Sequence, residues 1–507
     1  MTNTRERPAR SRNERFETGR ADRRPSPLAQ EGARRAAGNL DAAVSTLAAL
    51  VAFPTVAAPP APNVQLAAFR RLKEYLSRLS DDWDFDVEDH GAAVVIGLGR
   101  AQDRLGILTH GDVQPADRER WRGDPFSLDA TSEPGRLIGR GVEDDKASIS
   151  TALHAMRTVS RIGVPLRRRI ELIVSMTEES DWTPFREFVR GWDPPALNVA
   201  LDAKYPVVTA EKGTGGIFLT VPPDPPVRPR PARRGARLVS FTGGEARTRV
   251  PAAAVAVIEN AGLELAAELR AAADPSCGVT FALESEGDVL TVRARGAAAH
   301  SSTPWEGRNA VTHLAALLAR RDWPPTPASR MLQLVVDLVG TGDLAERFGD
   351  LACAHPFMGP LTLVLTRLYP CDDGGIEACL NLRCPAGRSR EQVEVQVREA
   401  VEAWTARRGR AAPGWRLTMG DPYYLESAPH VPVLVDVYRH YTGQHDAGPV
   451  AVGGGTQARL LPNGVNFGPS MPGAAYTGHS DHEFVTVEQL RLNLMMQAAM
   501  LVELAAG

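Results

Sequence analysis

The sequence predicts an α/β protein with a mostly parallel sheet flanked by helices and a second, α+β domain inserted into the chain. Short apolar runs alternate with helical periodicity up to about residue 212, which is the pattern of strand–helix–strand units. The pattern changes at Gly213 and returns near Gly420. A chain of 507 residues is also too long for one compact core. We therefore expect four segments: a tail (1–37), a main domain in two parts (38–212 and 419–507) and an inserted lid domain (213–418).

Residues 1–37 are predicted to be a solvated, disordered tail. They contain ten Arg against five acidic residues and few apolar side chains. An Arg-rich arm that binds nucleic acid is the alternative. We expect ordered structure to begin near Asn39.

The elements of the main domain follow from apolar spacing. Apolar residues recur at helical spacing over 40–51 and 64–79, and again from Ile149 to Val159. Between and after these helices, short apolar runs predict the strands Ala92–Leu98, Leu105–Leu108, Ile170–Met176 and Leu197–Leu201. The inserted domain shows strands such as Val289–Ala294 and Leu361–Leu365, and a helix with Val393, Val397, Val401 and Trp404 on one face.

Composition excludes several classes of protein. The net charge of -3 gives no general attraction to nucleic acid or to an anionic membrane. No apolar run approaches the roughly 18 residues that span a bilayer. The five cysteines include no Cys-x-x-Cys pair, and the N-terminus lacks an apolar segment of the signal-peptide type. We expect a cytoplasmic protein with no nucleic-acid or membrane partner.

Three polar side chains come directly after predicted strands. These are His110, Glu179 and Asp202. Open α/β sheets place their ligands at the carboxyl ends of the strands, so these side chains are expected to lie close together. Taken singly, His110-Gly111-Asp112 could equally be a surface turn, and Glu178-Glu179 a solvated one.

Two further turns carry groups of the same kind. Asp144 lies in Gly139–Lys146, just before a predicted helix, where an ordinary acidic N-cap is the alternative. His479 lies in Gly478–Glu483, where His482 is a rival. Two imidazoles and three carboxylates suit a pair of zinc-like ions. Glu178, beside one of these ligands, would supply a base for a water molecule.

Other motifs have less support. Gly453-Gly454-Gly455-Thr456 lacks the Gly-Lys-Ser/Thr ending of a phosphate-binding loop, although it could present backbone groups to a substrate. The nucleophile elbow Gly-x-Ser-x-Gly is absent from the sequence, so serine-hydrolase chemistry is not expected.

Taken together, the motifs resemble the di-zinc exopeptidase and acylase family that includes dipeptidase V, carnosinase, carboxypeptidase G and succinyl-diaminopimelate desuccinylase. The resemblance runs from about residue 40 to the C-terminus. It rests on the turns above and on the segments His110–Pro115, Asp202–Pro206, Glu211-Lys212-Gly213, Ala299-His300-Ser301, Gly307–Ala310 and Asn381-Leu382-Arg383. The Asp202–Pro206 segment, the Gly-Gly-Gly-Thr turn and the long insertion are most similar to the dipeptidase V branch. The fold that this implies is a zinc-exopeptidase-like sheet with an inserted lid.

The resemblance also implies roles for individual residues. Asp144 would bridge two Zn²⁺ ions per chain, with His110 and Asp202 completing one site and Glu179 and His479 the other. Glu178 would be the general base, and Asp112 would orient His110. In the lid, His300 would stabilise the oxyanion, and the substrate would be bound by Arg383, Asn309, Gly454 and Gly455. A cis peptide is expected at Asp144-Asp145.

The expected function is hydrolysis of an amide bond in a small peptide substrate with a free carboxylate, by a metal-bridged hydroxide. An N-acyl-amino-acid deacylase with the same metals is the alternative, and a non-catalytic binding homologue is a third hypothesis. Co²⁺ or Mn²⁺ could replace Zn²⁺. The enlarged lid implies a monomer, with a dimer as the alternative. Two departures from the family pattern, Gly111 and Ala147-Ser148, concern the frame of the site and not its ligands.

Overall fold

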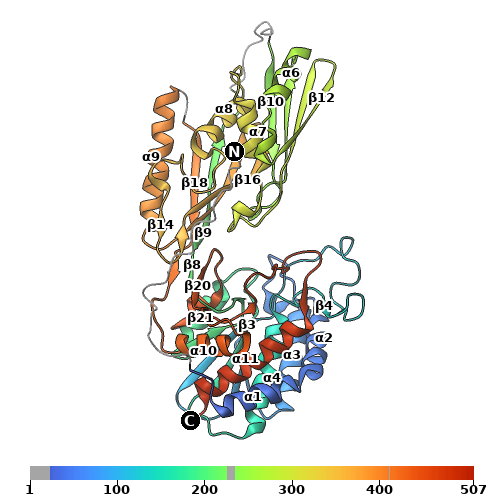
Figure 1. The fold of residues 1–507 in the computed structure, drawn as a ribbon, viewed down its shortest axis with the longest axis vertical. Helices are drawn as coiled ribbons and strands as arrows, with labels where there is room; N and C mark the ends of the chain where they lie inside the picture. The colour runs from blue at the N-terminus through green and yellow to red at the C-terminus, as the bar shows by residue number, and fades with distance from the viewer. Residues whose placement is uncertain (1–22, 225–234, 410–411) are drawn as a thin grey trace. The chain divides into compact units, whose positions relative to one another are not determined.

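The chain divides into two compact units, and a computed structural model describes residues 23–224, 235–409 and 412–507. We call residues up to 210, with 424–451 and 456–507, the large unit. We call residues 211–423, with 452–455, the inserted unit (Figure 1). The Gly-rich turn at 452–455 therefore groups with the inserted unit, because Lys212 N donates to Val452 O over 3.0 Å. Our sequence boundaries had left this turn in the main domain.

The large unit is built on a mixed sheet whose centre is parallel. Its strand order is β1–β2–β5–β3–β6–β21–β8–β19, with β20 beside β8. Strands β5, β3, β6 and β21 run parallel, and antiparallel pairs extend the sheet on both sides. The strands span Asp86–Asp89 (β1), Ala93–Leu98 (β2), Arg104–His110 (β3), Arg169–Ser175 (β5), Leu197–Ala200 (β6), Val207–Glu211 (β8), Tyr423–Tyr424 (β19), Pro449–Val452 (β20) and Gly464–Asn466 (β21).

Helices cover both faces of this sheet, because its central strands carry apolar side chains on both sides. In β5, Ile170, Leu172 and Val174 face one core, whereas Ile173 faces another that includes Phe185 of α5. The helices span Pro27–Ala37 (α1), Leu40–Val51 (α2), Ala67–Asp81 (α3), Lys146–Ile162 (α4), Thr183–Gly191 (α5), Val431–Thr442 (α10) and Val487–Ala505 (α11). The α/β prediction with helices on both faces is confirmed.

The N-terminal prediction was wrong in part. Residues 27–37 form helix α1, which packs against α11 and α4, although residues 1–22 lie outside the described part of the chain. Ala29, Ala33 and Ala36 are fully buried on the packed face. Alanines at helical spacing let two helices approach closely. They give only a weak hydrophobic signal in the sequence, however, and the many Arg residues of this segment obscure it. The sequence therefore looked disordered where a helix docks.

The inserted unit is an antiparallel sheet with helices packed on one face. Its strand order is β12–β13–β11–β10–β16–β17–β9–β18. Alternate residues such as Ile217, Leu219 and Val221 of β9 point into a core shared with the helices. The strands span Gly213–Val221 (β9), Arg237–Gly243 (β10), Ala253–Glu259 (β11), Thr280–Glu286 (β12), Val289–Arg295 (β13), Thr362–Pro370 (β16), Ile376–Cys384 (β17) and Gly414–Met419 (β18). The helices span Leu263–Ala272 (α6), Ala310–Leu318 (α7), Pro327–Leu334 (α8) and Arg390–Arg408 (α9).

Short elements complete the fold. Three small ladders pair Ala203–Lys204 (β7) with Pro469–Ser470 (β22), Arg136–Ile138 (β4) with Phe484–Thr486 (β23), and Ala354–His355 (β14) with Gly359–Pro360 (β15). Single helical turns lie at Asn63–Gln65 (η1), Pro275–Cys277 (η2), Pro304–Glu306 (η3), Val335–Val339 (η4), Gly349–Leu351 (η5) and Gln457–Leu460 (η6). In the described part of the chain, no helix combines the length and the apolar character needed to cross a bilayer.

Candidate metal centre

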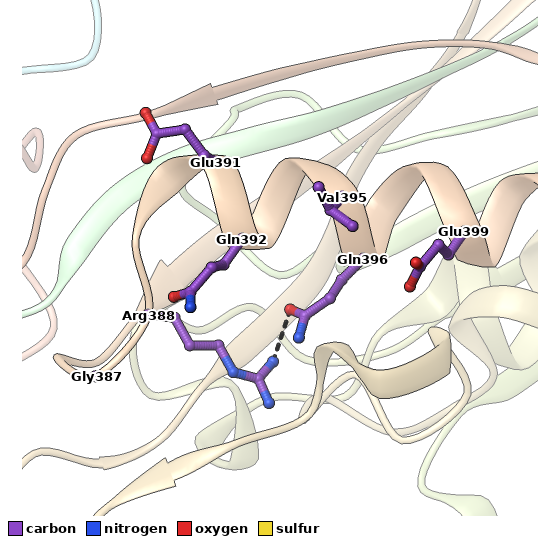
Figure 2. Close-up of a pocket in the computed structure, with 7 residues that line it drawn as sticks. All are labelled: Gly387, Arg388, Glu391, Gln392, Val395, Gln396 and Glu399. Carbon is purple, nitrogen blue, oxygen red and sulfur yellow. Dashed lines mark hydrogen bonds between the residues drawn. The ribbon is translucent and has the colours of Figure 1, made fainter.

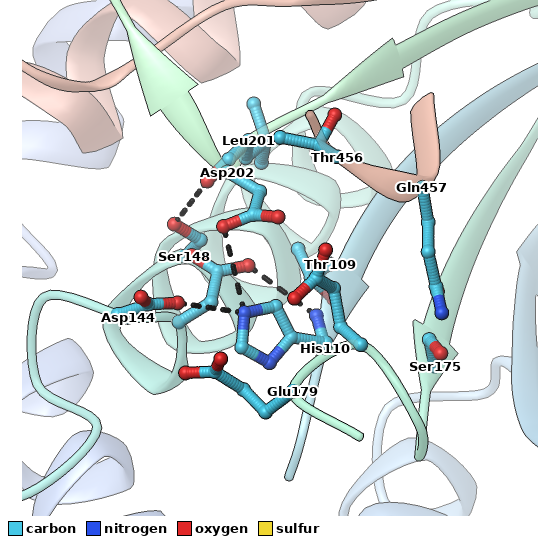
Figure 3. Close-up of polar contacts among 12 residues, drawn as sticks. Thr109, His110, Asp144, Ser148, Ser175, Glu179, Leu201, Asp202, Thr456 and Gln457 are labelled. Carbon is cyan, nitrogen blue, oxygen red and sulfur yellow. Dashed lines mark hydrogen bonds and ion pairs between the residues drawn. The ribbon is translucent and has the colours of Figure 1, made fainter. Parts of the chain in front are cut away.

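His110 is the last residue of the central strand β3, and its ring lies at the carboxyl edge of the parallel strands. Its Nε2 is 2.8 Å from Asp144 Oδ1 and 3.4 Å from Asp202 Oδ1 (Figure 3). Asp144 precedes helix α4, and Asp202 follows β6 by two residues. The ring is only 1% exposed. Three segments that are distant in the sequence thus bring one imidazole and two carboxylates together, and two of these residues, His110 and Asp202, are among those that the strand pattern places at this edge.

A second triad shares Asp144. The other oxygen of Asp144, Oδ2, is 3.0 Å from His479 Nε2, and the same nitrogen is 2.8 Å from Glu179 Oε1. Within each triad the ligand atoms lie within 4.8 Å of one another. The two triads have different exposure, because the side chain of His479 is 48% exposed whereas His110 is buried. Asp144 therefore faces both groups with one oxygen each.

The carboxylate of Asp112 fixes the Glu178-Glu179 turn. It accepts from Glu178 N at 2.9 Å and from Glu179 N at 3.0 Å. His110 Nδ1 lies 2.9 Å from the main-chain oxygen of Asp112 and 3.6 Å from its carboxylate. Asp112 thus orients the His110 ring chiefly through its carbonyl group, while its carboxylate holds the residue that we expect to be the base.

Burial and the close approach of charged groups shift several pKa values in this cluster. Burial raises the pKa of Asp202 to about 6, against the opposing effect of His110. Burial and the charge of Asp202 also raise the pKa of Glu178 well above its ordinary value. Burial lowers the pKa of His479, but hydrogen bonds to Asp144 and Glu179 outweigh it and raise that pKa to about 10. So many buried acids can all ionise only when positive charge lies among them.

The neighbours of the predicted ligands have other partners. Asp145 makes no side-chain capping bond to α4, and its Oδ2 accepts from His110 N at 3.3 Å. His482 Nε2 lies 3.2 Å from Glu133 Oε1, and so His479 is the histidine of this turn that joins a triad. The peptide between Asp144 and Asp145 is cis, as expected.

The two departures from the family pattern fit this frame. A Cβ on Gly111 would lie 2.7 Å from Leu72 Cδ2, so a larger side chain at this position would require Leu72 to shift. Ser148 Oγ donates to Leu201 O at 2.8 Å and ties the start of α4 to the residue before Asp202.

Several polar contacts at this centre were not predicted from the sequence. Gln114 Nε2 donates to Glu179 Oε2 at 2.9 Å, and the Tyr476 hydroxyl donates to Asp144 Oδ2. Glu143 and Glu483 join the turns that carry Asp144 and His479. Gln114 lies in a motif that we had quoted, but the other contacts join residues more than 300 positions apart, so local spacing could not indicate them.

His300 lies in the inserted unit and is exposed. Its Nδ1 accepts from Ser302 N at 3.2 Å and lies 2.7 Å from Ser302 Oγ. Because Nδ1 accepts a hydrogen bond from the main chain, the neutral ring carries its proton on Nε2. His300 is thus arranged as an Nε2–H donor.

Arg383 is buried on β17 and bonds to neutral groups. Its Nε donates to Asn381 Oδ1 at 2.9 Å and its Nη1 to Gly453 O at 3.0 Å. It forms no ion pair with any residue in the described part of the chain, and burial lowers its pKa to about 10. A buried guanidinium without an anion is a ready site for a carboxylate.

Three further residues were predicted as substrate contacts: Asn309, Gly454 and Gly455. Asn309 caps α7: its Oδ1 accepts from Val311 N and Thr312 N, and its Nδ2 donates to Leu365 O at 2.8 Å. These bonds fix Asn309 in the fold, and its role in substrate binding stays a prediction. A Cβ built on Gly454 would have no other atom within 4 Å, so there is open space beside its backbone. Gly455 follows it in the same turn.

A surface pocket of about 500 Å³ lies along helix α9 (Figure 2). Charged and amide side chains line it, and its Arg388 Nη1 already donates to Gln396 Oε1 at 2.8 Å. It contains none of the predicted site residues. We therefore assign no chemistry to it.

The donor set of the two triads fits divalent metal ions. Imidazole nitrogens and carboxylate oxygens are ligands of Zn²⁺ and similar ions, and a shared carboxylate is suited to a pair of them.

The sequence of this chain matches a known protein family. The model of peptidase family M20/M25/M40 matches residues 106–503. The chain belongs to this family.

Similar proteins span nearly the same length. YtjP of Bacillus subtilis (strain 168) is 30% identical over 428 residues, covering 82% of this chain and 86% of that protein. The Beta-Ala-Xaa dipeptidase of Lactobacillus delbrueckii subsp. lactis is 27% identical over 433 residues, covering 83% and 86%. The crystal structure of human carnosine dipeptidase 1 is similar in fold, with a TM-score of 0.55 at 15% identity over 94% of this chain and 99% of that one. The resemblance and the fold class predicted from the sequence are both confirmed.

Proposed function

We propose that this protein is a dipeptidase that uses two metal ions, favoured as Zn²⁺, to hydrolyse a small peptide with a free carboxylate. One observation carries the proposal: two ligand triads share Asp144, and Glu178 lies directly beside one of their members. Membership of a peptidase family and the named activity of the Lactobacillus relative support the substrate class. A monomer in the cytoplasm is part of the proposal, on the sequence grounds given above.

His110, Asp144 and Asp202 would hold one ion, and Asp144, Glu179 and His479 the other. When bound, such ions lower the pKa of a water molecule and polarise a carbonyl group. The remaining chemistry falls to side chains of the protein.

Glu178 is suited to take the proton of the attacking water and to return it to the leaving amine. Its main-chain N–H donates to Asp112 and its carbonyl oxygen accepts from Trp182 Nε1 at 2.7 Å, so the residue is fixed on both sides.

Two residues of the inserted unit would act on the substrate. His300 would donate its Nε2–H to the oxyanion, a contribution typically of about 10²–10³-fold in turnover. Arg383 would bind the free carboxylate, because its charge is unbalanced by any acid of the described chain. The backbone of Gly454 and Gly455 would assist.

Substitution of Glu178 tests the proposal. We expect Glu178→Gln to lower the hydrolysis of dipeptides by about 10²–10⁴-fold, the usual contribution of a general base, with two metal ions still bound. Elemental analysis gives the metal content. Glu187→Gln, on the exposed side of α5, is the matched control and should retain activity.

A substrate panel separates the alternatives. Dipeptides and N-acetyl amino acids that share the same C-terminal residue are compared at equal concentration. Faster cleavage of the acyl amino acids would replace the dipeptidase by a deacylase. Full activity of Glu178→Gln would reject the assigned base.

A further inference from the structure

Tyr476 contacts the shared aspartate. Its hydroxyl donates to Asp144 Oδ2, the oxygen that also lies 3.0 Å from His479 Nε2. Its ring is 6.1 Å from the His479 ring at an interplanar angle of 71°. Tyr476 is 49% exposed as a residue, and its hydroxyl reaches the Asp144 carboxylate, which is 11% exposed. Tyr476 therefore lies on the side of Asp144 that belongs to the second triad.

The main chain is shaped to admit this ring. A Cβ on Gly478 would lie 2.3 Å from the Tyr476 hydroxyl oxygen and 2.4 Å from Cζ. Any side chain at 478 would collide with the ring, and the ring could then not fold back over the turn. The observed position of the Tyr476 ring therefore depends on glycine at position 478.

Glu143 holds the same turn from the other side. Its Oε2 accepts from Thr477 N and Thr477 Oγ1, both at 2.6 Å, and from Gly478 N at 3.0 Å. Its Oε1 accepts from Ser470 Oγ at 3.0 Å. Because Glu143 directly precedes Asp144, the backbone that leads to His479 is fixed to the residue beside the shared ligand.

We propose that Tyr476 and Glu143 are positioning residues for the second metal position, formed by Asp144, Glu179 and His479, and that they set its affinity for metal. The inference rests on the two-metal function proposed above. The first position also uses His110, which ends β3, and Asp202, which follows β6, and neither residue lies in the 476–479 turn. Outer partners of metal ligands commonly contribute 10–100-fold to affinity. The two positions should therefore respond differently to loss of either residue.

The test measures metal binding and not turnover. Metal-free protein is titrated with Zn²⁺ against a chromophoric chelator, for the unmodified chain and for Tyr476→Phe and Glu143→Gln. We expect two ions in each case, with one affinity lowered by about 10–100-fold in both variants and the other unchanged. Tyr369→Phe is the matched control, because it removes a tyrosine hydroxyl that donates to Glu377 in the inserted unit. It should change neither affinity.

The other outcomes separate the two proposals. Two ions of unchanged affinity in both variants would overturn the positioning role alone. Weaker binding of both ions to the same extent, with a lower melting temperature of the metal-free variant, would also overturn the positioning role. The substitution would then lower metal affinity by destabilising the fold. An unmodified chain that binds fewer than two ions would reject the two-metal function itself.

Discussion

The buried ion pair between Arg140 and Glu483 joins the turn of Asp144 to the turn of His479. Arg140 Nη1 lies 2.7 Å from Glu483 Oε2, and the two side chains are 2% and 0% exposed. The Glu483 carboxylate also accepts from the main-chain nitrogens of Gly141, Glu143 and Asp144, at 3.0, 2.9 and 3.1 Å. The Glu483 side chain thus accepts hydrogen bonds from one guanidinium nitrogen of Arg140 and from three main-chain amides.

Glu483→Gln keeps the shape of the side chain and removes its charge. Arg140 is then buried without an anion. In addition, the side-chain NH₂ group of the glutamine replaces an oxygen that accepted hydrogen bonds, so its N–H groups face the N–H groups of Arg140 or the main chain. Breaking a buried pair from one side typically costs about 3–5 kcal/mol of unfolding free energy. For a domain of this size, that loss corresponds to a fall of roughly 6–20 °C in melting temperature.

The assay is urea unfolding followed by circular dichroism, with a chelator present so that metal binding does not enter. The double variant Arg140→Met/Glu483→Gln should lose less than the sum of the single variants, because it no longer buries an unpaired charge. Glu133→Gln is the control: it loses partly exposed pairs with Arg136 and His482, and its unfolding free energy should change far less than that of Glu483→Gln. A change of similar size in Glu483→Gln, or additive losses in the double variant, would refute the reasoning.

Two further predictions concern stability. Burial, with help from Arg157 and Arg161, lowers the pKa of His154 to about 4 in the folded protein, against 6.5 in the unfolded chain. The folded state therefore binds fewer protons, and stability is lost as the pH falls from about 6.5 toward 4, by about 3 kcal/mol in all. His154→Gln should flatten the unfolding free energy over this range relative to the unmodified chain, and parallel curves would contradict the assignment. At the N-terminus, Ala33→Leu should lower the unfolding free energy by about 1–3 kcal/mol, because Ala33 is fully buried in helix α1, which packs against α11 and α4. The exposed control Arg34→Ala should change it by less than about 0.5 kcal/mol, and equal effects of both would argue against docking of α1.

Local patterns predicted that three of the five candidate ligands lie close together, because a strand and the residue that follows it are encoded together. His110 ends β3, and Glu179 and Asp202 follow β5 and β6 within a few residues. Parallel pairing of β3 with β5 and β6 then brings these ends to one edge of the sheet. The turns of Asp144 and His479 were identified by residue type and by resemblance, not by geometry.

Local patterns failed where a contact joins distant segments. Local patterns did not indicate that Asn309 caps α7 and donates to Leu365 on β16. The buried alanines of α1 looked like part of a disordered tail, because only α11, at the opposite end of the chain, makes their burial favourable.

The sequence alone determined the α/β class, the family resemblance and the residue types of the candidate metal centre, because periodicity and strand-end polarity are local properties. Only the tertiary structure decided which atoms meet: which oxygen of Asp144 faces which histidine, and that Glu143, Glu483 and Tyr476 hold the turns together. The physical reason is distance along the chain. A hydrogen bond needs atoms within about 3 Å of each other, and residues 300 positions apart reach that separation only when the whole domain has packed.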